Sequence, residues 1–226
     1  VEPIEETYEI SEADLKRIAA EINAAERPVI YYGGGIVSSQ ACQDLVALMH
    51  KADIPATGSM MSLGCVPTDD PLYLGMIGMH GKVSAGWAVD RADLLLSIGA
   101  RFSDRVATNT NRFAPDARII HIDIDAAEIN KNMPADDFLV TDAKTFLSGV
   151  LPYVQPAKHD DWKTQIEDWR TRLDYHPQDA EDCLHPHQIV QICTELGGDD
   201  LIFATDVGQH QMWAAQYCGR KHSRQF

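Results

Sequence analysis

An apolar run at 28–32 ends in three consecutive glycines, Gly33, Gly34 and Gly35. Together with Ser38 they give the pattern G-x-G-x-x-S, and glycines between a strand and a helix let the backbone approach a phosphate closely. A NAD site also needs an acid about twenty residues later. The stretch 56–62 contains none, so the sequence disfavours plain NAD binding. The alternative is that the glycines only allow tight strand-to-helix packing.

Two arginines follow the next long apolar run, "DLLLSIGA" at 93–100. Arg101 and Arg105 come just past the carboxyl end of this predicted strand, where ligands bind in open α/β sheets. The planar guanidinium suits phosphate and carboxylate because it donates two hydrogen bonds at once. Local pairing with Asp104 is the alternative to ligand binding.

Three further stretches carry residues suited to binding. Asp123, near the end of the alternating run 118–125, can accept hydrogen bonds from ribose hydroxyls, or cap the turn that follows. The stretch "GMIGMHG" offers backbone N–H groups and methionines, with a structural role as the alternative for His80. At 201–216, an apolar run, Gly208 and a helical segment predict a strand, a turn and a helix N-terminus that faces an anion.

The composition excludes several classes of function. A net charge of −15 over 226 residues opposes binding to nucleic acid or to an anionic membrane surface. The sequence shows neither a bilayer-spanning apolar stretch nor the features of a signal peptide. Five widely spaced cysteines without a C-x-x-C pair favour a reduced, cytoplasmic protein. His185 and His187 have no third ligand nearby, so no metal site is predicted.

Alternating strands and helices must position these residues. Apolar runs predict strands at 27–35, 53–60, 93–100, 118–125 and 138–142. Helical spacing predicts helices at 81–92, at 143–154 and after the glycines, where Ser38 is the expected N-cap. The stretch between 60 and 81 is rich in Gly, Pro and Asp and reads as a loop. This order predicts the α/β class, a doubly wound parallel sheet with flanking helices, from about Ile10 to Val154.

The composition changes twice along the chain and divides it into three parts. Residues 1–154 are expected to form one nucleotide-binding domain, with 1–10 as a linker. Residues 155–184 read as a polar linker that carries one packing helix, with an apolar face made of Trp162, Ile166, Trp169 and Leu173. Residues 185–226 begin a second α/β domain and are too few to complete one. The sequence therefore reads as a fragment of a longer protein.

Four motifs in this order and spacing carry a resemblance to a known family: "YYGGGI", "LGMIGMHGKVSAGWAVDRADLLLSIGARFSDRV", "IIHIDIDAAEINKN" and "DVGQHQMWAAQ". They closely resemble the catalytic large subunits of acetohydroxyacid synthases, also called acetolactate synthases, over nearly the whole chain. The resemblance implies a Rossmann-like central domain that binds FAD. It also implies that the following part begins the domain that binds the diphosphate half of thiamine diphosphate.

The resemblance also implies roles for individual residues. Residues expected to contact FAD are Gly33, Gly34, Gly35, Ser59, Met60, Met61, Ile77, Gly78, Met79, His80, Gly99, Ala100, Arg101, Asp123, Ile124 and Asp142. Those expected to meet thiamine diphosphate are Val207, Gly208, Gln209 and His210. Arg105 is expected to receive the carboxylate of the second 2-keto acid, with Asp104 orienting it and Met79 beside it. Ser103 and Ser62 depart from the family pattern, where Asp and Gly are usual.

The implied reaction condenses pyruvate with pyruvate or 2-ketobutyrate and leads to branched-chain amino acids. In the family, the active site forms at a homo-oligomer interface, and the resemblance implies a regulatory small subunit as a partner. The magnesium-binding G-D-G…N motif and the activating glutamate are absent from this sequence, so the chain alone is expected to be inactive. Two alternatives stay open: a relative such as glyoxylate carboligase or pyruvate oxidase, and a nucleotide-binding module without activity.

Overall fold

A computed structural model describes residues 10–175, 177–178 and 183–226, and residues 1–9 of the predicted linker lie outside the described part. Six parallel strands form one sheet in the order β3-β2-β1-β4-β5-β6. The strands are β1 (Pro28–Tyr32), β2 (Ala56–Gly58), β3 (Tyr73–Met76), β4 (Leu94–Ile98), β5 (Arg118–Asp123) and β6 (Asp137–Val140). The predicted doubly wound parallel sheet is thereby confirmed.

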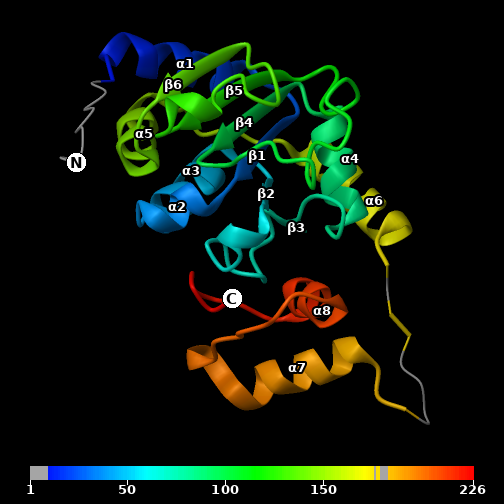
Figure 1. The fold of residues 1–226 in the computed structure, drawn as a ribbon. Coiled ribbons are helices and arrows are strands. Elements are labelled where there is room, and N and C mark those ends of the chain that lie inside the picture. The colour runs from blue at the N-terminus through cyan, green and yellow to red at the C-terminus, as the bar shows by residue number, and fades with distance from the viewer. Residues whose placement is uncertain (1–9, 176, 179–182) are drawn as a thin grey trace, which may run out of the picture.

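The sheet has a helical layer on each face because its strands are apolar on both sides. Alternate residues of β1 point to opposite faces, so that Ile30 packs with the first layer and Val29 with the second. The first layer consists of α1 (Glu12–Ala24), α3 (Cys42–Ala52) and α5 (Ala143–Val150). The second layer consists of α4 (Val83–Arg91) and α6 (Asp160–Leu173), as Figure 1 shows.

The glycine stretch forms a short helix of its own, α2 (Gly34–Ser38), directly after β1. Ser38 is the last residue of α2, and the N-cap of α3 is Ala41, so the expected capping by Ser38 is wrong. The chain breaks between the two helices because Gln40 takes a left-handed conformation with φ of 56°. The result is a one-turn helix whose first residues lie at the end of β1.

Strand β3 is a strand that the sequence predictions missed, since the stretch 60–81 reads as a loop. It has four residues and lies at the edge of the sheet. Gly75 within it has a φ of +90°, and its pairing with β2 shifts register between Ala56 and Gly58. A short irregular edge strand with an internal glycine leaves little periodic signal in the sequence.

The predicted packing helix in the linker is confirmed as α6. Its residues Trp162, Ile166 and Trp169 are buried against the second layer. The indole Nε1 of Trp162 donates a hydrogen bond to the carbonyl of Pro28 at the start of β1. This helix therefore supports the sheet from the side opposite α1, α3 and α5.

The C-terminal part contains two α-helices, α7 (Pro186–Gly197) and α8 (Gln209–Tyr217), which pack on each other. Figure 1 shows α8 between α7 and the sheet, and Ala215 of α8 packs with Leu63 and Met76. The helix predicted after Gly208 is confirmed. The strand predicted at 201–204 is wrong: residues 201–206 have no assigned helix or strand, because the part of the chain described here places no strand beside them.

None of the helices formed by the described residues is long and apolar enough to cross a membrane.

Candidate functional site

A cavity of about 1080 Å³ opens where the strand order reverses, between the loops that follow β1 and β4. The chain runs outward from β1 to β3 and then returns to β4 on the other side of β1, so the two loops diverge at this point. The loop after β4 contributes residues 99–106, and three further segments complete the wall: 59–63, 76–80 and the C-terminal part from Ile202 to Phe226. The cavity matches the larger ligand sites of proteins in size.

The cavity brings together many of the residues selected from the sequence. Those that line it are Gly34, Gly35, Ser59, Met60, Met61, Ile77, Met79, His80, Gly99, Ala100, Arg101, Arg105, Val207 and Gly208. Those that do not line it are Gly33, Gly78, Asp104, Asp123, Ile124, Asp142, Gln209 and His210. The first set comes from both strand loops and from the start of α8, as expected for a site at a switch point.

The glycine turn is packed directly against the loop after β4. A Cβ at Gly33 would lie 2.3 Å from the Gly99 carbonyl oxygen and 2.6 Å from the Ala100 Cα. Gly99 itself has a φ of +55°, and a Cβ there would lie 2.8 Å from the Gly35 Cα. Tight packing thus explains why Gly33 is a glycine. It also brings the backbone of Gly34 and Gly35 to the cavity surface.

Three arginines line the cavity, Arg101, Arg105 and Arg224, and none of the described lining residues is Asp or Glu. The chain as a whole has a net charge of −15. The cavity is therefore a positively charged surface on an acidic protein. Arg101 lies 3.6 Å from Glu128, while Arg105 has no ion-pair partner in the part of the chain that the structure describes. The alternative of pairing with Asp104 is not found. The cavity therefore favours an anionic ligand.

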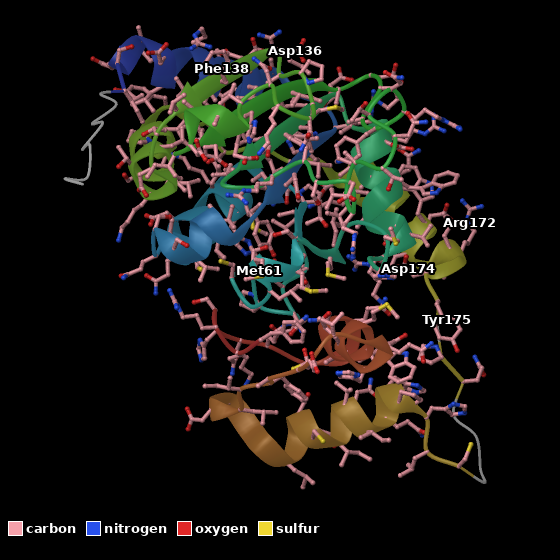
Figure 2. The ribbon with its side chains drawn as sticks, in the orientation of Figure 1. Met61, Asp136, Phe138, Arg172, Asp174 and Tyr175 are labelled. Atoms are coloured by element: carbon pink, nitrogen blue, oxygen red, sulfur yellow. The ribbon has the colours of Figure 1, made fainter. Side chains whose placement is uncertain are left out.

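The loop that carries Met79 contacts the loop that carries Arg105, and both residues line the cavity. The N–H of Met79 donates a hydrogen bond of 2.9 Å to the Arg105 carbonyl, and a Cβ at Gly78 would lie 2.6 Å from that same oxygen. The loop that carries Met79 is thus fixed to the loop that carries Arg105. Met61 and Met79 are 77% and 60% exposed, and Figure 2 shows Met61 on the side of the sheet that faces the C-terminal helices.

The acids selected from the sequence have local backbone partners instead. The carboxylate of Asp123 accepts a hydrogen bond from the N–H of Asp125, and Asp125 caps the turn Ala126–Glu128. Asp142 is the N-cap of α5, and Ile124 is exposed beyond the end of β5. The residue that caps this turn is thus Asp125, two residues after Asp123. A role for Asp123 toward a ribose stays a prediction.

Two residues under the cavity floor were not selected from the sequence. Tyr31 of β1 lines the cavity and donates a hydrogen bond of 3.0 Å to the Arg101 carbonyl, and its burial raises the pKa of the phenol. His121 of β5 is buried, with Nε2 3.1 Å from the Ala100 carbonyl oxygen. Burial lowers the pKa of His121, so the ring is neutral and donates from Nε2. The only sequence signal for either was its place in an apolar strand.

The C-terminal wall also contains residues that sequence reasoning missed. Gln211 and Met212 of α8 line the cavity, as do Ile202, Arg224 and Phe226. Arg224 and Phe226 follow the last helix in a short stretch without apolar periodicity, so no local pattern points to them. Among the described residues, no group of three or more His, Cys, Asp or Glu side chains is placed to hold a metal ion.

Comparison with known proteins shows the family of this chain. The family model described as "Thiamine pyrophosphate enzyme, central domain" matches residues 15–150. The chain is 41% identical to acetolactate synthase 1, chloroplastic, of Nicotiana tabacum over 94% of its length. It is 38% identical to the acetolactate synthase isozyme 1 large subunit of Escherichia coli over 96% of its length, and 40% identical to a probable acetolactate synthase large subunit of Methanocaldococcus jannaschii over 94%.

The chain spans only 32% to 38% of the length of these three relatives. The part matched by the family model contains all six strands, the helices α3, α4 and α5, and the loops that carry Arg101 and Arg105. The chain therefore belongs to the thiamine pyrophosphate enzyme family, whose central domain it contains, and is a homologue of acetolactate synthase large subunits.

Proposed function

We propose that this chain is the flavin-binding part of an acetolactate synthase, which condenses pyruvate with a second 2-keto acid, either pyruvate or 2-ketobutyrate. Residues 1–154 would form the central domain, 155–184 the linker with its packing helix, and 185–226 the opening of the thiamine diphosphate domain. The observation that carries the proposal is the cavity at the switch point, lined by three arginines without any described carboxylate. Its shape and charge suit a large anionic ligand.

The residues present fit FAD at the level of chemistry. Glycine backbone at Gly34 and Gly35 reaches the cavity surface because the turn packs without side chains, which suits a diphosphate group. The exposed side chains of Met61 and Met79 and the buried Ile77 supply an apolar surface for a flat ring. Arg101 would contact the dinucleotide from the loop after β4. FAD binding by these residues is our proposal, supported by this lining.

Arg105 would bind the carboxylate of the second 2-keto acid. Its guanidinium has no competing ion pair among the described residues, and its carbonyl fixes the Met79 loop. A substrate held by this fork would lie beside Met79, whose side chain would exclude water from that end. Asp104 is exposed and does not line the cavity, so any orienting effect on Arg105 would depend on a different side-chain arrangement.

Val207 and Gly208 on the C-terminal wall would meet thiamine diphosphate, and Gln209 and His210 would follow at the exposed start of α8. When bound with Mg²⁺, thiamine diphosphate supplies the carbanion chemistry that decarboxylates a 2-keto acid. We further propose a homo-oligomer with a regulatory small subunit. The described cysteines are free thiols, which fits a reducing compartment such as the cytoplasm.

Substitution of the two arginines in the full-length synthase tests these roles. Arg105→Lys keeps the charge and loses the bidentate fork, so we expect formation of product per enzyme to fall at least about tenfold with flavin content nearly unchanged. Arg101→Lys should instead lower flavin content. Flavin absorbance per subunit and steady-state rates measure the two effects. Loss of flavin in Arg105→Lys and retention in Arg101→Lys would reverse the assignment.

A further inference from the structure

The C-terminal stretch 218–226 adds one cation to the cavity from a segment unrelated to the strand loops. We propose that Arg224 binds the diphosphate group of a cofactor from this wall, and this inference rests on the proposed function. Two bound molecules can present that group, a flavin dinucleotide and thiamine diphosphate. Arg101 would then hold the cofactor from the loop after β4 and Arg224 from the opposite wall, while Arg105 stays available for the 2-keto acid.

The position of Arg224 is fixed by its neighbours on both sides. The side-chain oxygen of Gln225 accepts hydrogen bonds from the N–H groups of Lys221 and His222, and its carbonyl accepts one from Phe203. Phe226 packs under the guanidinium of the buried Arg220, at 5.6 Å from its ring centre. The backbone that carries Arg224 is thus anchored, while its own side chain is exposed.

The backbone of Arg224 has a φ of 66°, in the left-handed region. A residue other than glycine, asparagine or aspartate rarely takes this conformation because its Cβ crowds the following carbonyl. Such a conformation persists only where the surroundings impose it, and it is frequent in ligand sites. Here the anchored Gln225 and Phe226 impose it, and the side chain of Arg224 lies on the cavity wall.

The guanidinium of Arg224 is not neutralised by a carboxylate of the described residues. Arg101 has Glu128 at 3.6 Å, whereas Arg224 has no ion-pair partner among the described residues. No described carboxylate lines the cavity that it faces. A guanidinium placed there pairs best with a planar or tetrahedral oxyanion that accepts several hydrogen bonds, and a diphosphate offers more charge and more acceptors than a single carboxylate.

The test uses the 226-residue chain and the variant Arg224→Asn, because asparagine accepts the left-handed backbone and removes the charge. Arg112→Asn is the matched control, since Arg112 is exposed and does not line the cavity. Binding is measured by calorimetry with four probes: FAD, riboflavin, thiamine diphosphate and thiamine. Thermal unfolding of each variant is recorded beside it, and we expect the melting temperatures to stay unchanged.

For Arg224→Asn we expect about tenfold weaker binding of FAD or thiamine diphosphate, and unchanged binding of the matching probe without phosphate. The diphosphate probe that is affected identifies which cofactor supplies the group. Equal affinities in Arg224→Asn and the wild type, or an equal loss with riboflavin or thiamine, would overturn the role of Arg224 alone. Failure of the wild type to bind FAD and thiamine diphosphate would overturn the proposed function as well.

Discussion

Replacing Gly33 by alanine should greatly lower the free energy of unfolding of the central domain and abolish flavin binding. The added Cβ would lie 2.3 Å from the Gly99 carbonyl oxygen and 2.6 Å from the Ala100 Cα. Both are backbone atoms, so the loops after β1 and β4 must separate. We expect a loss of about 3 kcal/mol and a fall in melting temperature of about 6–12 °C.

The control for Gly33→Ala is Gly86→Ala in the middle of α4. A Cβ at Gly86 would have nothing within 4 Å, and alanine favours a helix over glycine by about 0.5–1 kcal/mol. This variant should therefore be as stable as the wild type or slightly more stable, with the same flavin affinity. A Gly33→Ala protein that melts at the wild-type temperature would show that the two loops are not in the contact described here.

The second large effect is expected for Trp162→Ala in α6. The side chain of Trp162 is buried, packs edge-on against Trp169 and donates a hydrogen bond to the Pro28 carbonyl. Its removal leaves a large cavity under β1 and removes the hydrogen bond to the Pro28 carbonyl, at a cost of about 3–5 kcal/mol. Because α6 lies on the sheet and not at the cavity, flavin affinity of the remaining folded protein should be unchanged.

Trp87 of α4 is the matched control for Trp162. It belongs to the same aromatic cluster, with its ring centre 5.7 Å from that of Trp169, but it is 42% exposed. Trp87→Ala should cost about 1 kcal/mol, the contribution of one aromatic contact. Chemical denaturation of the two variants measures the difference. Equal losses would contradict the buried position of Trp162 and with it the role of α6 as a support of the sheet.

The sheet could be predicted because a strand covered on both faces must be apolar at nearly every position. The stretches that became β1 and β4 are of this kind, and their carboxyl ends locate the switch point. Strand β3 could not be predicted because it has only four residues, one of them a glycine at positive φ, and so shows no alternation of apolar and polar residues. The apolar run at 201–204 was predicted as a strand, although a strand also needs a neighbour, which no local pattern can report.

The site was predictable where its residues follow strand ends and not where they come from distant segments. Gly34, Gly35, Arg101 and Arg105 line the cavity from the two loops that the sequence marks. Arg224 reaches the same cavity only because the segment 218–226 folds back under η1 (Met60–Ser62) and α8. His121 was missed because a histidine within an apolar strand is indistinguishable from one that only packs, until its contact with the Ala100 carbonyl is seen.

Calorimetric titration of the chain with FAD, beside the variant Gly34→Leu, tests most directly the claim that the switch-point cavity binds a flavin dinucleotide. A Cβ at Gly34 would contact only Met61 within 4 Å, at 3.2 Å from its Cβ, so a leucine there enters the cavity without disturbing the sheet. We expect saturable one-to-one binding to the wild type in about the micromolar range, and at least about tenfold weaker binding to Gly34→Leu at an unchanged melting temperature. Absence of saturable binding, or equal affinity in the variant, would contradict the claim.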